Sequence, residues 1–138
     1  MKANIIVFIT ALALTGFGAE KIQSGPKGGR ILGKTEPKAE FFLEKDRTAT
    51  ITFYDAKSKR VEVKDQSVAI TVGKQKIDFE KKDQVLVSKS KLPEGDALPI
   101  VVQFKQSGDA KPQNFRFKLD TSVCGGCKLA EYACTCHE

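Results

Sequence analysis

The stretch Ser67-Val68-Ala69-Ile70-Thr71-Val72-Gly73-Lys74-Gln75-Lys76-Ile77-Asp78-Phe79 decides the fold that the sequence predicts. Apolar and polar residues alternate along two runs, and the pair Gly73-Lys74 lies between them. A period of two is expected where one face of a β-strand is buried and the other is solvated. Glycine favours the tight turn that joins such strands. This stretch therefore predicts two strands.

The same alternation recurs on both sides of this stretch, and turn-forming residues separate the runs. No segment of the domain shows a sustained helical period. Seven or eight short strands at this spacing predict an all-β fold, an antiparallel immunoglobulin-like β-sandwich, over residues 39–121. The further runs are 39–44, 50–54, 84–88, 100–104 and 115–119.

The apolar positions of these runs predict the hydrophobic core. Burial of each large apolar side chain contributes roughly 1.5–3 kcal/mol, so we expect the domain to fold without its cysteines. The predicted core residues are Ile51, Phe53, Val68, Ile70, Val72, Ile77, Phe79, Ile100, Val102, Phe104, Phe115, Phe117 and Leu119.

The first 18 residues resemble a signal peptide. Lys2 supplies a positive charge, residues 5–14 are apolar apart from one threonine, and small residues surround a cleavage site after Gly18. The apolar run is shorter than the ~20 residues that span a bilayer. We therefore expect a signal peptide at 1–18, a flexible lead-in at 19–38, and a periplasmic or secreted protein with no stable membrane span after cleavage.

The charge pattern argues against a nucleic-acid partner and against an enzyme. The 138-residue chain has a formal net charge of +6, but its lysines are scattered and form no basic motif. His137 is the one histidine, and most acidic residues lie among lysines at turns. No glycine-rich loop leads from a strand into a helix to bind phosphate. We therefore expect a non-enzymatic protein with no nucleic-acid partner.

The residues best suited to chemistry lie in a cysteine-rich tail at 122–138. Its pattern is CxxC, six residues, then CxC followed by histidine. Two close pairs joined by a short loop can converge on one tetrahedral ion, and thiolates suit Zn(II) or Cu(I). The predicted metal ligands are Cys124, Cys127, Cys134 and Cys136, with His137 as a substitute ligand.

Two other interpretations of the tail remain open. An exported protein with an even number of cysteines usually forms disulfides, and pairing between the CxxC and CxC halves would be the easier geometry. A redox CxxC motif is a third interpretation, although the usual βαβ context is missing. Leu129 and Tyr132 would cover the site or dock the tail.

Three stretches, 28–32, 39–47 and 51–55, resemble a group of small exported bacterial β-sandwich proteins. They are also similar to the sandwich modules of periplasmic adaptors in heavy-metal efflux systems. Those modules often carry His-Gly-Gly near their start, whereas this chain has Lys27-Gly28-Gly29. The resemblance implies a β-sandwich in the bacterial envelope, and because lysine stands in place of that histidine, no N-terminal metal ligand is carried over from those modules.

These observations predict an exported protein that binds a soft transition metal through its tail and acts as a carrier, buffer or sensor. The alternative is a structural or interaction module of the cell envelope, with a disulfide-bonded tail and an envelope protein as partner. The sequence predicts no particular oligomeric state.

Overall fold

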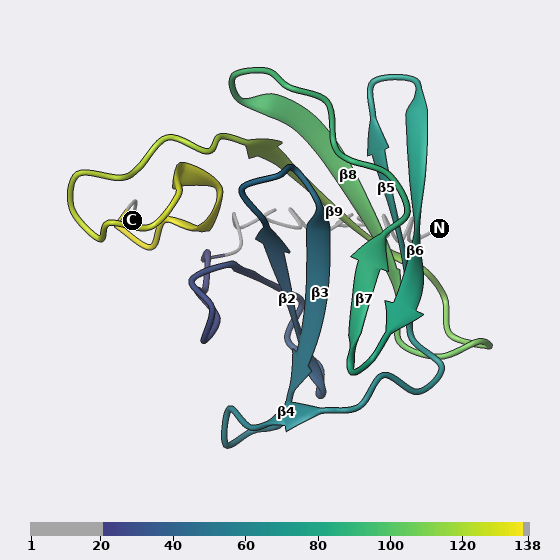
Figure 1. The fold of residues 1–138 in the computed structure, drawn as a ribbon. Coiled ribbons are helices and arrows are strands. Elements are labelled where there is room, and N and C mark those ends of the chain that lie inside the picture. Colours follow the sequence, from purple (N-terminus) through teal and green to yellow (C-terminus); the bar gives the residue numbers. More distant parts are fainter. Residues whose placement is uncertain (1–20, 137–138) are drawn as a thin grey trace, which may run out of the picture.

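A computed structural model describes residues 21–136. Within that range the regular structure consists of nine β-strands and one 3₁₀ helix, shown in Figure 1. The elements are β1 (Arg30–Leu32), β2 (Lys38–Leu43), β3 (Ala49–Tyr54), β4 (Arg60–Val61), β5 (Ser67–Val72), β6 (Gln75–Lys82), β7 (Val85–Ser88), β8 (Leu98–Lys105), β9 (Gln113–Leu119) and η1 (Glu131–Ala133).

All paired strands are antiparallel, and their order is β1-β2-β3-β7-β6-β5-β8-β9, with β4 paired to β3. One layer contains β1, β2, β3, β4 and β7, and the other contains β5, β8 and β9. The long strand β6 belongs to both layers, because its first half pairs with β5 and its second half pairs with β7. The layers face each other as a nearly closed, barrel-like sandwich (Figure 1). The predicted antiparallel β-sandwich is confirmed.

The structure differs from the sequence prediction in its shortest strands. β1 has three residues and β4 has two, which is too short for alternation to be visible in the sequence. β1 lies inside the predicted lead-in at 19–38, so the β-structure begins before residue 39. The predicted signal peptide at 1–18 lies outside the described residues. Among the described residues, no helix is long and apolar enough to cross a membrane.

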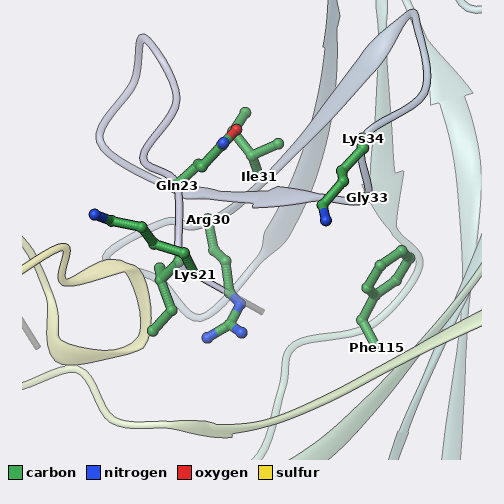
Figure 2. A pocket seen from close by; sticks show the side chains of 8 residues that line it. Lys21, Gln23, Arg30, Ile31, Gly33, Lys34 and Phe115 are labelled. Atoms are coloured by element: carbon green, nitrogen blue, oxygen red, sulfur yellow. The ribbon is translucent and has the colours of Figure 1, made fainter. Parts of the chain in front are cut away.

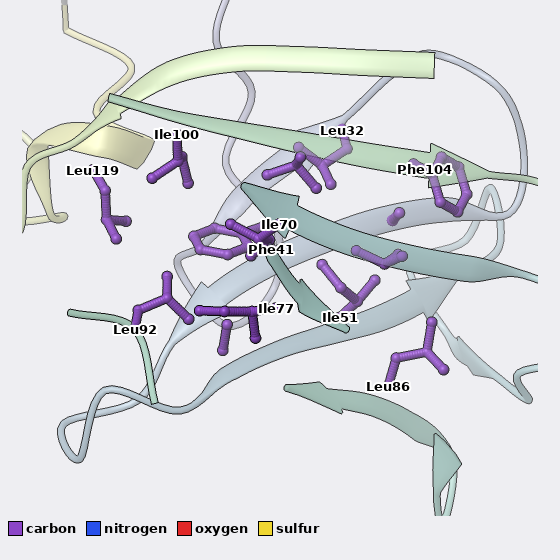
Figure 3. Close-up of a cluster of buried hydrophobic side chains, with 14 of the residues drawn as sticks. Leu32, Phe41, Ile51, Ile70, Ile77, Leu86, Leu92, Ile100, Phe104 and Leu119 are labelled. Carbon is purple, nitrogen blue, oxygen red and sulfur yellow. The ribbon is translucent and has the colours of Figure 1, made fainter. Parts of the chain in front are cut away.

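The core lies between the two layers, as Figure 3 shows. Phe53 of β3 packs against Phe104 of β8 with ring centroids 5.9 Å apart, which joins one layer to the other. Most of the predicted core is buried, whereas Phe79, Phe115 and Phe117 are only partly buried. Large core residues that the sequence prediction omitted are Leu32, Phe41, Val63, Leu86, Leu92 and Tyr132.

β1 and β9 are the two ends of the strand order, and no strand pairing between described residues joins them. Side-chain contacts connect these two strands instead. The Arg30 guanidinium lies 4.5 Å from the ring centroid of Phe117. A small cavity of about 40 Å³ remains at this seam, between Gly33 and Phe115 among others (Figure 2). The seam therefore depends on cation–π and apolar contacts.

A buried carboxylate fixes the segment that precedes β1. Glu40 of β2 is fully buried, and its carboxylate accepts hydrogen bonds from the backbone N–H groups of Lys27 and Gly29, the latter at 2.7 Å. A side chain on Gly25 would collide with this carboxylate. Successive backbone N–H groups form a favourable site for an anion, so Glu40 holds residues 25–29 against the outer face of β2.

Tyr54 lies beside this carboxylate at the end of β3. Burial raises the pKa of Tyr54 to about 12, and the negative charge of Glu40 contributes in the same direction. Burial also raises the pKa of Tyr132, the second tyrosine of the chain. Both phenols are therefore neutral in the fold at a pH where an exposed tyrosine ionises.

We expect the free energy of unfolding to fall as pH rises from about 10 to about 12. The tyrosines of the unfolded chain lose their protons near pH 10.0 while Tyr54 keeps its proton to about 12, so the unfolded state binds fewer protons. Urea unfolding at several pH values would measure the slope. The Tyr54→Phe variant should have a shallower slope, and an unchanged slope would contradict this assignment.

Candidate metal centre

Tyr132 of η1 docks the tail on the sandwich. Its ring packs edge-on against Phe41, at 5.6 Å between centroids, and stacks on Phe117 at 6.5 Å. Its hydroxyl accepts a hydrogen bond of 3.1 Å from the backbone N–H of Leu43. Its carbonyl accepts a hydrogen bond from the Arg30 guanidinium. The docking role predicted for Tyr132 is confirmed.

Backbone hydrogen bonds hold the rest of the tail in a compact loop. The N–H of Tyr132 donates to the carbonyl of Asp120, and the N–H of Glu131 donates to that of Ser122. A β-bridge joins Val123 to Ala130. The chain therefore turns back on itself after β9, which places the CxC segment beside the CxxC segment.

The four cysteines of the tail converge. All four sulfur atoms lie within 4.8 Å of one another. The Sγ of Cys134 lies 3.1 Å from that of Cys124 and 3.5 Å from that of Cys127. Cys124 and Cys134 are buried, Cys127 is half-buried and Cys136 is exposed. Four sulfur atoms thus lie close together in the tail, with the Cys136 side open to solvent.

The sulfur–sulfur distances of 3.1 and 3.5 Å are somewhat shorter than those around a tetrahedral zinc ion, and all of these distances lie within 4.8 Å. Zinc–sulfur bonds of about 2.3 Å place the sulfurs of a tetrahedron about 3.8 Å apart. A disulfide needs a sulfur–sulfur distance of about 2.05 Å, and all four cysteines are free thiols in this structure. The cluster is compatible with metal binding, and Cys124, Cys127, Cys134 and Cys136 could all serve as ligands.

Gly126 allows the CxxC turn to approach the CxC segment. A Cβ atom at this position would lie 2.9 Å from the Sγ of Cys136, so a side chain would displace this sulfur. A Cβ atom on the neighbouring Gly125 would meet no atom within 4 Å. The close approach of backbone to sulfur therefore requires glycine at 126 and not at 125.

Backbone N–H groups prepare the sulfurs for negative charge. Hydrogen bonds from the N–H groups of Leu129 and Thr135 lower the pKa of Cys127 to about 6. The N–H of Cys136 donates to the Sγ of Cys134 at 3.4 Å. Such bonds favour the thiolate, which is the form that binds metal. Of the three thiols whose pKa is shifted, Cys127 is the one that ionises most readily.

The pKa values of Cys134 and Cys136 are shifted in the opposite direction. The hydrogen bond with the Cys124 thiol raises the pKa of Cys134 to about 12. The hydrogen bond with Cys127 raises the pKa of Cys136. In both cases the largest cause is a hydrogen bond with a neighbouring cysteine, which favours the neutral thiol. A cation bound at the centre would favour the thiolates instead.

The structure brings together the four cysteines that the sequence predicts. The fifth predicted ligand, His137, lies outside the described residues. Sequence reasoning missed Arg30 and Phe41, which hold Tyr132, and the contact of the 25–29 segment with Leu129. These contacts link parts of the chain about a hundred residues apart, and no local pattern marks them.

Comparisons with known proteins give no match for this chain: no family model, no curated protein and no solved structure matches it.

We expect a thiol-alkylating reagent to modify Cys127 before Cys136 in the reduced, metal-free protein at neutral pH. Cys136 is the more exposed thiol, but the pKa of Cys127 is lowered and that of Cys136 is raised. Timed alkylation with iodoacetamide and peptide mass mapping would give the order. In urea the preference should disappear, and faster modification of Cys136 in the folded protein would contradict the prediction.

Proposed function

We propose that this chain is an exported metal-binding protein that holds one soft transition-metal ion in its C-terminal tail. The supporting observation is the convergence of four cysteine sulfurs within 4.8 Å. A tetrahedral set of four sulfurs favours Zn(II), and Cu(I) is the second candidate. The ligands are Cys124, Cys127, Cys134 and Cys136, and His137 is a substitute ligand.

The setting of the site supports a role in carrying, buffering or sensing metal. Cys136 is exposed, whereas Cys124 and Cys134 are buried, so an ion would be reached from one side. The cysteines are not part of the hydrophobic cluster of the sandwich core, whereas Tyr132 and Ala133, which directly precede Cys134, belong to it. The export signal predicted at 1–18 supports action in the periplasm or outside the cell, by binding and not by catalysis.

A native mass spectrum of the mature protein tests this proposal. We expect the mass of one zinc or copper ion together with four reduced cysteines. Cys134→Ser should abolish metal retention because Cys134 is fully buried at the centre of the cluster. His137→Ala should change it little if the four thiolates suffice.

The alternative, an envelope module with a disulfide-bonded tail, predicts a different spectrum. The protein would be metal-free and its mass would be lower by the hydrogens of the oxidised thiols. The 3.1 Å between Cys134 and Cys124 makes this pair the first candidate for such a bond. A chelator disorders a metal-bound tail, whereas a reductant disorders a stapled one.

Two neighbouring glycines give a matched pair of variants. We expect Gly126→Ala to weaken zinc binding by about 10- to 100-fold, the usual effect of disturbing the surroundings of a ligand, because the added Cβ displaces Cys136. Gly125→Ala should bind zinc like the wild type, since open space surrounds that position. Competition with a chromophoric zinc chelator would measure both affinities, and equal affinities would contradict the proposed geometry.

A further inference from the structure

A groove lies beside the metal centre, between the tail and the turn that joins β2 to β3. We call it the tail groove, and its volume is about 630 Å³. One wall comes from residues 42–47 and the other from residues 121–132. Figure 1 shows the tail next to these strands. Pockets of this size commonly bind ligands or short peptide segments.

The lining of the tail groove combines apolar and basic side chains. Phe42, Val123 and Leu129 supply apolar surface. Val123 is 68 % exposed and is the one strongly exposed large hydrophobic residue within residues 21–136. Val123 is not isolated, because it lines the groove together with Phe42 and Leu129, and a contiguous apolar surface rimmed by polar residues is typical of an interaction site.

The charged side chains that line the groove are mostly basic. Lys27, Lys45, Arg47 and Lys128 line it together with one acid, Glu44. Glu44 already pairs with Lys27 at 2.9 Å. The Arg47 guanidinium donates to the carbonyls of Leu92 and Pro93, and the Lys128 ammonium donates to the carbonyl of Gly125. Because these carbonyl groups are neutral, they do not balance the positive charges of Arg47 and Lys128. The groove is therefore complementary to a segment that has carboxylates around one apolar side chain.

The tail wall of this groove is continuous with the metal centre. Lys128 and Leu129 directly follow Cys127. The N–H of Lys128 donates to the carbonyl of Cys124, and the N–H of Cys124 donates to the carbonyl of Leu129. An ion that fixes the sulfurs of Cys124 and Cys127 therefore also fixes the residues that form this wall.

We infer that the tail groove docks an acidic segment of a partner protein, with an apolar side chain against Val123, and that metal in the cysteine cluster strengthens this docking. The docking surface stands on the groove itself, whereas its dependence on metal rests on the proposed function. The protein thereby reports its metal load to a partner.

Fluorescence anisotropy with a labelled peptide of alternating glutamate and leucine tests the inference. We expect saturable binding to the zinc-loaded protein that weakens as salt is added. The double variant Lys45→Glu, Lys128→Glu should bind roughly tenfold more weakly or worse. The matched control is Lys57→Glu, Lys74→Glu, which reverses two charges on distant turns and should bind like the wild type. Val123→Asp should also weaken binding.

The outcomes separate the docking surface from the metal site. No saturable binding up to about 1 mM peptide, equal binding by both double variants, or binding of a labelled single-stranded oligonucleotide in place of the peptide would overturn the docking inference. Peptide binding that is groove-dependent but unchanged by a chelator would overturn the metal dependence and retain the docking surface. A protein that takes up neither zinc nor copper yet binds the peptide would contradict the proposed function, and with it the metal dependence, but would retain the docking surface.

Discussion

The docking of Tyr132 between Phe41 and Phe117 is the contact on which the geometry of the cysteine cluster depends. Beyond β9 the chain leaves the sandwich, and a short segment has little apolar surface with which to offset the entropy of ordering. One aromatic ring in the core, with its hydroxyl on the backbone of β2, provides that anchor. The cluster is thus carried on a rigid platform, and Cys134 follows directly after the anchored helix.

The segment before β1 and the tail after β9 lie together at one end of the sandwich. The buried Glu40 carboxylate holds residues 25–29, and Gly28 of that segment faces Leu129 of the tail. Arg30 completes the link, because it contacts both Phe117 and the carbonyl of Tyr132. The cysteine cluster is therefore supported by contacts with the segment before β1 as well as by the tail itself, and the buried Glu40 carboxylate holds that segment in place.

The spacing of the CxxC and CxC pairs predicts the cysteine cluster, and alternation predicts the long strands, because both are local patterns. Alternation misses β1 and β4, which are too short to show a period, and Leu92, which is buried from a loop. Glu40 illustrates a different failure: acidic residues are presumed solvated, yet this one is fully buried because backbone N–H groups satisfy it. The groove beside the cluster also depends on tertiary contacts, so no motif could reveal it.

The division of β6 between the two layers has a consequence for how the molecule opens. Because Gln75–Asp78 pairs with β5 and Phe79–Lys82 pairs with β7, a break in either layer removes hydrogen bonds from the same strand. Amide protons in β5 and in β7 should therefore exchange with solvent through one shared, global event. The two layers therefore form a single cooperative unit.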